Sequence, residues 1–210
     1  MFGILKNIKR LIFLVILTAL AFMVVNILAF WQIGSFYVLK KYPQFEKVEQ
    51  IAKIAEKIQG NEKKKEMKEE AMLLIIDKLK IEAPIIKSIN EKEKDIQEDL
   101  KNGVVLFPNT AMPGGFGNTV LFGHSSDYFW RDGNFKTIFS LLNQLNAEDE
   151  IKIIENNKEL IYKVTNKQIV SKNNKVILEQ TENEHRLTLI TCWPIGTDLK
   201  RLAIEAELVE

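Results

Sequence analysis

A run of apolar residues near the N-terminus, 11–31, limits the fold of this 210-residue chain more than any other feature. Only Thr18 and Asn26 interrupt its 21 residues. As a helix rising about 1.5 Å per residue, the run would be roughly 31 Å long, which matches the hydrocarbon core of a bilayer. Three basic residues within 1–10 precede it, which predicts a cytoplasmic N-terminus. We therefore expect a transmembrane anchor over 11–31 and an extracytoplasmic remainder at the cell membrane.

A cleaved signal peptide is the alternative interpretation of the same run. The apolar region of such peptides is usually about 7–15 residues long, which is shorter than the run here. The small residues that would mark cleavage, near Ala19 and Ala21, also lie inside the apolar run rather than after it. An uncleaved, single-pass anchor is therefore favoured, with the lipid bilayer as a partner of residues 11–31.

Charge and cysteine content exclude two classes of function. The formal net charge is +1, so nothing in the overall charge predicts nucleic acid or another polyanion as a partner. The chain has one cysteine, so it cannot form an intramolecular disulfide. A single thiol in an extracytoplasmic compartment is instead a candidate reactive group.

The segment after the anchor, residues 32–71, is predicted to be a linker. It is highly charged from residue 41 onward, and its apolar residues recur at steps of three and four up to Ile58. This spacing is typical of an amphipathic helix, which we expect to break near Gly60. We interpret the segment as a helical stalk between the membrane and a domain that spans residues 72–210.

Short strand-like segments dominate residues 72–210, separated by turn-rich stretches such as "NTAMPGGFG". A short helix is predicted over "EKEKDIQEDLKNG", and a second over 134–145, where Asn134 is a candidate N-cap. Many short strands with one or two small helices predict a mainly β fold, a closed or nearly closed barrel. The expected strands are "LLIIDKLKIEAPII" (one or two strands ending near Pro84), "VVLFP", "NTVLFGH", "EIKIIE", "KELIYKVTNKQIV", "KVILEQ", "RLTLITC" and "RLAIEAELV".

The last two strands present a thiol and a guanidinium to each other. In "RLTLITC", Cys192 shares a face with Thr188 and Ile190, opposite the leucines, and in "RLAIEAEL" Arg201 lies opposite the apolar face. The connection "WPIGTDL" is short enough to make these strands antiparallel neighbours. If the leucine-rich faces point into the core, Cys192 and Arg201 both point outward and can meet at the mouth of the hairpin.

Cys192 alone has two interpretations, because free cysteine is also among the residue types most often buried in a core. A thiol of ordinary pKa is only about 3% ionised at pH 7 and needs assistance to act as a nucleophile. His124 follows a strand-like segment in "LFGHSSD" and can stabilise a thiolate or protonate a leaving amine. Arginine can hold a developing oxyanion without competing for that proton. Together the three residue types suffice for acyl transfer through a thioester.

The pentapeptide "TLITC", Thr188 to Cys192, resembles the TLxTC signature of sortases, the membrane-anchored cysteine transpeptidases of bacterial surfaces. Further segments resemble sortases in the same order and cover about residues 72–210: "LIIDKLKIEAPII", "LKNGVVLFPNTAMPGGFGNTVLFGHSS", "FSLLNQLNAEDEIKII" and "RLAIEAEL". The resemblance implies an eight-stranded, sortase-like β-barrel with its site in an outer groove. Around "AEDEI" the chain departs from the Gly-Asp turn of many relatives.

The resemblance also implies roles for individual residues. Cys192 would be the nucleophile that attacks a Thr–Gly-type bond in an LPxTG-like, C-terminal sorting signal of a secreted protein. His124 would be the general acid and base, and Arg201 would stabilise the oxyanion or substrate. Thr191 would assist the oxyanion through its hydroxyl or its amide. An amine of a peptidoglycan precursor or a surface protein would then resolve the thioester, with no cofactor and no metal.

Two other functions stay open from the residues alone. A papain-like cell-wall cysteine peptidase would use the same thiol and imidazole, but in those enzymes the cysteine usually precedes the histidine in the chain. A non-catalytic, membrane-tethered peptide-binding barrel would retain the fold without the reaction. The presence of His124, Cys192 and Arg201 in one chain disfavours this third interpretation.

Overall fold

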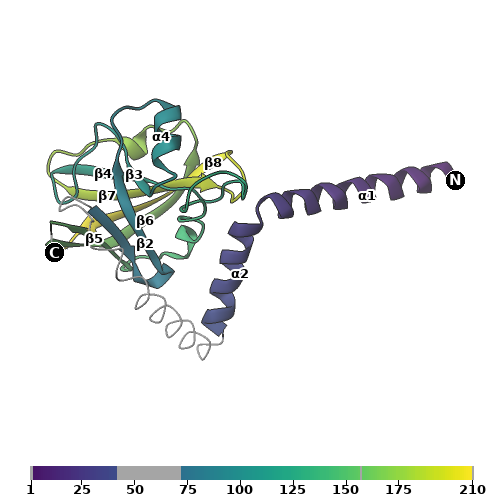
Figure 1. Cartoon of the computed structure of the whole chain (residues 1–210), viewed down its shortest axis with the longest axis horizontal. Coiled ribbons are helices and arrows are strands. Elements are labelled where there is room, and N and C mark those ends of the chain that lie inside the picture. Colours follow the sequence, from purple (N-terminus) through teal and green to yellow (C-terminus); the bar gives the residue numbers. More distant parts are fainter. Residues whose placement is uncertain (1, 42–71, 157, 210) are drawn as a thin grey trace.

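The computed structural model describes residues 2–41, 72–156 and 158–209, and it combines two N-terminal helices with a β-barrel (Figure 1). The helices are α1 (Phe2–Val25) and α2 (Ile27–Lys41). The barrel comprises β1 (Met72–Ile76), β2 (Ile81–Lys87), β3 (Val104–Leu106), β4 (Gly117–Phe122), β5 (Glu150–Glu155), β6 (Lys158–Ser171), β7 (His185–Trp193) and β8 (Lys200–Leu208). Short helices connect the strands: η1 (Asp77–Leu79), α4 (Glu93–Asp99), η2 (Leu142–Gln144) and η3 (Val176–Leu178).

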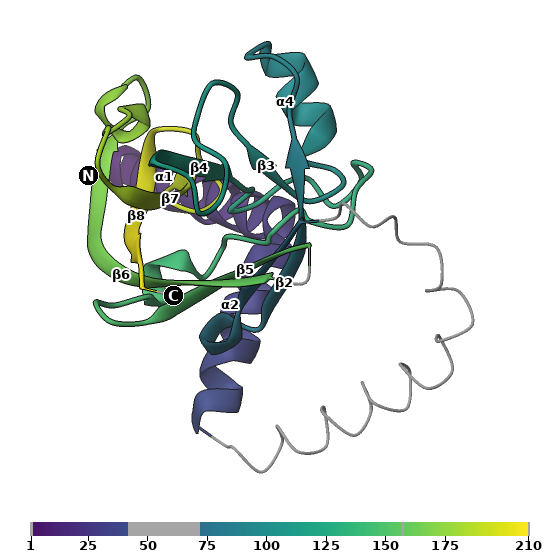
Figure 2. The ribbon, with the colours of Figure 1, turned by 90° about the vertical axis from the view of Figure 1, so that its left-hand side faces the viewer.

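The eight strands close into a barrel in the order β1-β2-β3-β4-β7-β8-β6-β5 (Figure 2). Most neighbours are antiparallel, but β2 pairs with β3 and β4 pairs with β7 in parallel. The mainly β, closed eight-stranded barrel predicted from the sequence is therefore confirmed. Closure leaves no free edge among the described strands, which removes the row of unpaired backbone groups that an open sheet exposes.

Strand alternation fills the barrel as predicted for β7 and β8. Leu187 and Leu189 of β7 lie in the main core with Leu202 and Ile204 of β8. The opposite face is also covered near its middle, because Ile190 and Ala203 join a second, smaller cluster beneath η3. The outward face of this hairpin is thus apolar at Ile190 and Ala203, and the next pair toward the loop is Cys192 and Arg201.

Three predictions differ from the structure. The segment 134–145 is a series of turns that ends in η2, yet Phe139, Leu142 and Leu145 are buried in the main core. The spacing of these side chains therefore predicted correctly that they are buried, but their backbone forms turns rather than an α-helix. The segment "KVILEQ" holds η3 instead of a strand, and its Ile177 caps the second cluster. Pro84 lies inside β2, opposite Leu73, rather than at its end.

The apolar N-terminal run forms two helices rather than one. Helix α1 ends at Val25 and α2 begins at Ile27, within the span predicted over 11–31. The Phe22 carbonyl accepts hydrogen bonds from both the backbone amide and the side-chain amide of Asn26, at 3.2 and 3.0 Å. A side chain that competes for a helix carbonyl is a known cause of local bending. Residues 7–25 are long and apolar enough to cross a membrane and are a candidate anchor.

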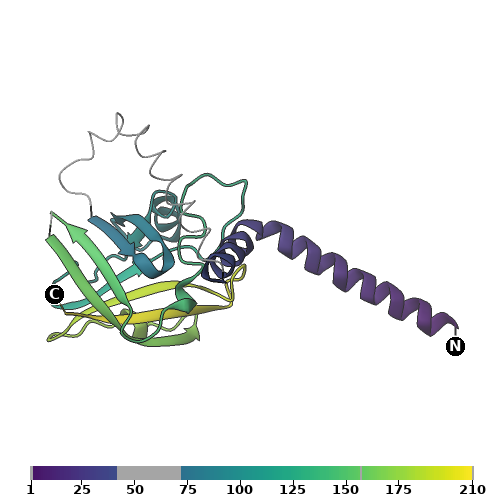
Figure 3. The same ribbon diagram turned by 90° about the horizontal axis from the view of Figure 1, so that it is seen from below.

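Helix α2 packs against the barrel instead of extending α1 (Figures 1 and 3). Ala29 is fully buried, and Ile33 and Phe36 pack on the main core cluster. Further along, the Gln144 side-chain amide donates a hydrogen bond to the Tyr37 hydroxyl at 3.0 Å. The part of the predicted stalk from residue 32 to 41 is therefore attached to the barrel, and the amphipathic helix expected over 42–71 lies outside the described residues.

Substitution of Gly123, between β4 and His124, should destabilise the barrel. A Cβ at Gly123 would lie 2.5 Å from Cδ2 of the buried Phe139 ring. Overpacking of this kind costs about 1–3 kcal/mol. We expect Gly123→Ala to lower the unfolding free energy by that amount in denaturant titrations of the full chain, and a second change, Phe139→Leu, to recover part of it.

Gly34 of α2 provides the control, because nothing lies within 4 Å of a Cβ added there. Gly34→Ala should not lower the stability of the barrel, because alanine fits there and favours a helix more than glycine does. Equal unfolding free energies for Gly123→Ala and the parent chain would contradict the packing described between β4 and the 134–145 segment.

Candidate active site

Strand register brings the three predicted site residues together at one end of the barrel. In the parallel β4–β7 pair each residue lies beside the one 68 positions later, as Phe122 lies beside Ile190. His124 and Cys192 have the same separation: His124 lies two residues after the end of β4, and Cys192 lies near the end of β7. In the antiparallel β7–β8 pair, Cys192 lies directly opposite Arg201. The imidazole therefore comes from the loop just after β4, the thiol from β7 and the guanidinium from β8, and the hairpin geometry expected for Cys192 and Arg201 is present.

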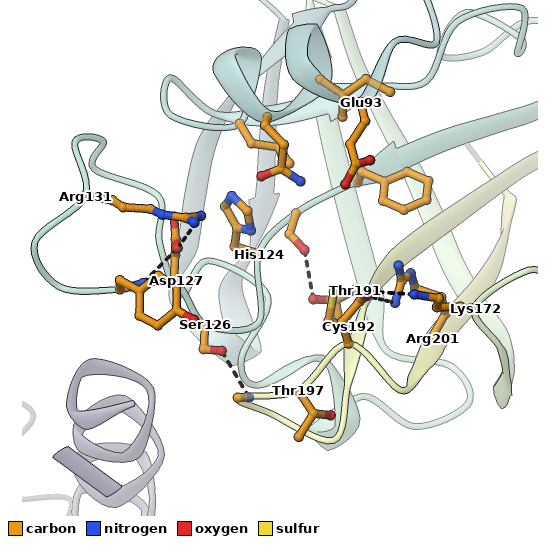
Figure 4. Close-up of a pocket in the computed structure, with 18 of the residues that line it drawn as sticks. Glu93, His124, Ser126, Asp127, Arg131, Lys172, Thr191, Cys192, Thr197 and Arg201 are labelled. Carbon is orange, nitrogen blue, oxygen red and sulfur yellow. Dashed lines mark hydrogen bonds and ion pairs between the residues drawn. The ribbon is translucent and has the colours of Figure 1, made fainter. Parts of the chain in front are cut away.

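All three side chains line a single cavity of about 820 Å³ (Figure 4). In Figure 4 His124 and Arg201 lie on either side of Cys192. The walls are formed by the β7–β8 loop, by the loop after β4, by α4, and by the junction of α1 and α2. A cavity of this size and mixed lining is suited to a short peptide or a small molecule.

The Cys192 thiol is partly buried and protonated at rest. It donates a hydrogen bond to Oδ1 of Asp198 at 3.7 Å. Burial raises the pKa of the thiol, and the Asp198 carboxylate raises it further, while the Arg201 guanidinium opposes both effects. Burial prevails because desolvation of a thiolate is costly. The resting site therefore holds a thiol rather than a thiolate at neutral pH.

His124 is held by the loop that follows β4, and its carbonyl accepts a hydrogen bond from Phe139 N at 2.9 Å. Burial lowers the pKa of the imidazole, and the nearby Arg131 lowers it too, whereas Asp127 raises it. The neutral imidazole is thus favoured at neutral pH, because desolvation penalises its charged form. The sequence predicts a histidine that stabilises a thiolate or protonates a leaving amine, which requires the charged imidazole; burial, which no local pattern reports, favours the neutral imidazole at rest.

Arg201 is already paired in this structure. Its Nη1 lies 2.5 Å from Oδ1 of Asp198, and Lys172 Nζ lies 3.1 Å from the other carboxylate oxygen. The two cations lower the pKa of Asp198 despite its partial burial. Asp198 thus contacts the thiol, the guanidinium and a lysine together. A substrate carbonyl that binds Arg201 must compete with this carboxylate.

Thr191 has a structural contact in addition to its place on the cavity wall. Its hydroxyl donates a hydrogen bond to the Gly123 carbonyl at 2.8 Å and is buried. This bond ties the end of β7 to the residue just before His124. Of the two groups by which Thr191 was expected to act on an oxyanion, the hydroxyl is therefore engaged with Gly123.

Three other residues close in sequence to His124 or Cys192 have contacts of their own. Asp127 accepts hydrogen bonds from Tyr128 N and from Arg131, so it caps its loop, and its charge raises the pKa of His124. His185, the second histidine, interacts through Nδ1 with the Gly115 carbonyl at 3.0 Å and lies outside the cavity. Trp193 packs against the main core rather than lining the cavity.

Two parts of the site were not predicted from the sequence. Asp198 lies in the β7–β8 loop three residues before Arg201, and this short separation is the sequence feature from which their ion pair could have been predicted. The α1–α2 junction also forms one wall, through Phe22 and Asn26 among others, because α2 folds back onto the barrel. No local pattern predicts this second contact. Within the described ranges no cluster of three or more acidic, histidine or cysteine side chains is placed to hold a metal ion.

Comparisons with known proteins agree on one family. The sequence model of the Sortase domain matches residues 74–209. Sortase D of Bacillus subtilis is 26% identical over 140 residues, which cover 65% of this chain and 63% of that protein, so the match spans less than two thirds of its length. The crystal structure of sortase C-1 from Actinomyces oris superposes with a TM-score of 0.57 at 26% identity, covering 66% and 73% of the two chains.

A third similar protein is a sortase C from Clostridium perfringens, solved with the C-terminal cell wall sorting motif. It has a TM-score of 0.55 at 23% identity and covers 66% of this chain and 69% of its own. At this identity the likeness supports the fold.

The reactivity of the thiol should report the contact with Asp198. Asp198→Asn removes the negative charge that raises the thiol pKa and leaves Arg201, which lowers it. The thiolate fraction at pH 7 should therefore rise. We expect the alkylation rate with iodoacetamide, measured by mass spectrometry across a pH series, to increase at neutral pH and its profile to shift to lower pH.

Asp99→Asn removes a carboxylate at the end of α4, outside the cavity; it is the control and should leave the profile unchanged. The single cysteine makes the readout specific, because Cys192→Ala removes the only thiol. An Asp198→Asn profile identical to that of the parent chain would contradict the proposed electrostatic contact.

Proposed function

Because this chain belongs to the sortase family, we propose that it is a membrane-anchored cysteine transpeptidase that cleaves a C-terminal sorting signal and transfers the acyl part to an amine. The observation that supports the proposal is that His124, from the loop after β4, lines one cavity with Cys192 of β7 and Arg201 of β8. These residues supply a nucleophile, a proton donor and a cation, the set that acyl transfer requires.

In the first step, the Cys192 thiol transfers its proton to His124, and the resulting thiolate Sγ attacks the carbonyl carbon of the scissile peptide bond. The carbonyl oxygen takes up negative charge, and Arg201 stabilises it after exchanging Asp198 for the substrate. The C–N bond then breaks, His124 gives a proton to the leaving amine, and a thioester remains on Cys192. Thr191 supports this geometry by tying β7 to Gly123, next to the histidine.

In the second step, an acceptor amine attacks the thioester carbonyl. His124, now neutral, takes the proton from that amine, and the C–S bond breaks to release the thiolate. The products are a new amide bond and a free site. Water in place of the amine would give hydrolysis instead, so access of the acceptor to the cavity decides between transfer and cleavage.

Protonation limits the fraction of molecules ready to react. Burial lowers the His124 pKa and raises the Cys192 pKa, so the neutral pair predominates between the two values. The thiolate–imidazolium form is then a minor population, but it holds both a strong nucleophile and a proton donor. The active population falls as pH drops below the histidine pKa or rises above the cysteine pKa, which gives a bell-shaped dependence of kcat/KM on pH.

The substrate class we propose is a secreted protein with an LPxTG-like signal. The related sortase C solved with a C-terminal cell wall sorting motif supports this class. The acceptor is an amine of a peptidoglycan precursor or of a surface protein. We place the barrel outside the cytoplasm, because the apolar helix 7–25 is preceded by basic residues that favour a cytoplasmic N-terminus.

Incubation of the full chain in detergent micelles with fluorogenic sorting-signal peptides and a glycine-based amine tests the proposal. Cleavage and ligation should both occur, and Cys192→Ala should abolish both together with the thioester seen by mass spectrometry. His124→Ala should lower kcat/KM by about 10²- to 10⁴-fold, the usual contribution of a general acid or base. Arg201→Ala should lower it by about 10²- to 10³-fold, as loss of an oxyanion donor does.

His185→Ala is the matched control, because it removes the only other histidine at a position outside the cavity. It should retain activity. Intact peptides across a broad panel of signals would overturn the proposal. Cleavage of peptidoglycan stem peptides without any ligated product would favour the papain-like peptidase, and binding of peptides without reaction at Cys192 would favour a binding module.

A further inference from the structure

Helix α2 has two apolar faces, and the barrel covers only one of them. Residues 27–38 form an apolar helix without a charged residue. One face is in contact with the barrel: Ala29 is buried, and Ile33 and Phe36 pack on the main core cluster. These positions recur at steps of three and four, as expected for one side of a helix.

The other face forms an exposed stripe, defined by Ile27, Trp31 and Val38. Their side chains are 52%, 77% and 52% exposed. Steps of four and seven place them in one row along the helix. Gly34 lies in the same row between Trp31 and Val38, and a Cβ added there would have no described atom within 4 Å. Such a continuous exposed apolar surface marks a site of interaction with another molecule or with lipid.

The position of α2 in the molecule indicates what covers this stripe. Helix α1, the candidate membrane span, leads away from the barrel, and α2 runs across its direction (Figures 1 and 3). In Figure 1 the barrel lies on one side of α2 and α1 extends on the other. If α1 crosses the bilayer, α2 lies along the bilayer surface, with one face on the barrel and the exposed stripe facing away from it.

The length and composition of α2 fit this position. An apolar helical stretch of about 10–14 residues is too short to span a bilayer and is typical of a core helix or an interfacial segment. A core helix would be buried on all sides, which the exposed stripe excludes. Trp31 and Tyr37 are of the residue types that gather at the membrane–water interface, and two lysines, Lys40 and Lys41, end the helix.

A second set of exposed aromatic residues, besides Trp31 and Tyr37 of α2, lies beside the cavity that contains Cys192. Tyr128, Phe129 and Trp130 are 41%, 50% and 59% exposed, and the rings of Tyr128 and Trp130 stack at 4.7 Å. Tyr128 lines the same cavity as Phe22, near the end of α1. This aromatic loop, residues 128–130, therefore lies near the outer end of the candidate membrane span and next to the site.

The close approach of α1 to the catalytic loop completes the geometry. A Cβ at Gly196, in the β7–β8 loop, would lie 2.7 Å from both the Phe22 ring and the Asn26 side chain. Gly196 has a φ of +81°, and its amide donates a hydrogen bond to the Ser126 hydroxyl at 3.0 Å. The loop that carries Asp198 therefore contacts the last turn of α1 at Phe22 and the α1–α2 junction at Asn26.

We propose that the exposed stripe of α2 and the aromatic loop lie in the headgroup region of the bilayer, so that the cavity with Cys192 opens at the membrane surface. The partner is a phospholipid surface, which covers apolar side chains on one side while the barrel covers the other. The consequence for substrates rests on the proposed function: a sorting signal next to an apolar membrane segment would reach Cys192 without leaving the bilayer surface.

Depth-dependent quenching of tryptophan fluorescence tests this placement without requiring activity. The chain has three tryptophans, so three full-length variants can each keep one, with phenylalanine at the other two positions. Each is reconstituted in phosphatidylcholine–phosphatidylglycerol vesicles that carry a nitroxide either near the lipid headgroup or at the end of the acyl chain. Trp31 and Trp130 should be quenched more by the shallow nitroxide than by the deep one, and Trp193, which packs on the barrel core, by neither.

Quenching of Trp31 no stronger than that of Trp193 would overturn the proposal. The same result together with cross-links between two chains through Val38→Cys would show that a second copy covers the stripe instead of lipid. For that arm Cys192 is replaced by alanine, so that residue 38 carries the only thiol.

A matched pair of charge variants tests the functional consequence. Val38 and Val209 are both exposed valines, 52% and 55%, one in the stripe and one after β8. Val38→Asp should reduce cleavage of a vesicle-inserted signal peptide several-fold and leave cleavage of a soluble peptide unchanged, because a charge in the interface opposes seating on lipid. Val209→Asp should change neither.

The two experiments separate the two proposals. Shallow quenching without any peptide cleavage would support the membrane placement and overturn the transpeptidase function. Cleavage without quenching would support the function and overturn the placement. Equal loss of soluble-peptide cleavage in Val38→Asp would also count against the placement, because it would indicate damage to the site rather than to its contact with lipid.

Discussion

The parallel register between β4 and β7 is the constraint on which the site depends. It pairs residues 68 positions apart as far as Phe122 and Ile190, and the loop that follows brings His124 into the same cavity as Cys192; the antiparallel β7–β8 pair places Arg201 opposite Cys192. A slip of one residue in either pair would turn one side chain to the opposite face of the sheet. Closure of the barrel opposes such a slip, because each strand is hydrogen bonded on both sides. The Thr191–Gly123 hydrogen bond ties β4 to β7 just before the reacting groups.

Electrostatics keeps this site inactive at rest in the mechanism we propose. Burial favours the neutral forms of both His124 and Cys192, and Asp198 occupies the guanidinium of Arg201. The same low polarity that disfavours the ionised pair makes each charge more effective once a substrate is bound. Binding that displaces Asp198 would therefore both free the cation and remove a carboxylate that disfavours the thiolate.

The N-terminal helices belong to the site as well as to the anchor. Helix α2 contributes Ile33 and Phe36 to the packing of the barrel, and the α1–α2 junction walls the cavity through Phe22 and Asn26. A tether that also forms part of the binding surface restricts how the barrel can turn relative to the membrane. The orientation of α2 would therefore determine both how the barrel is attached to the membrane and how a substrate reaches the cavity, which is why the exposed stripe of α2 matters for the proposed placement.

The sequence by itself determined the features that depend on local patterns. Period-two alternation identified most strands and the outward faces of Cys192 and Arg201, and a long uncharged run identified the candidate anchor. Patterns failed where the spacing of buried side chains does not match the backbone conformation. The core side chains of 134–145 have helical spacing, but their backbone forms a series of turns. The segment "KVILEQ" has the apolar character of a strand, but it forms η3. Only the tertiary structure decided the neighbours of the thiol. Asp198, the lowered His124 pKa and the docking of α2 arise from contacts between distant segments, and no local periodicity encodes which surfaces meet.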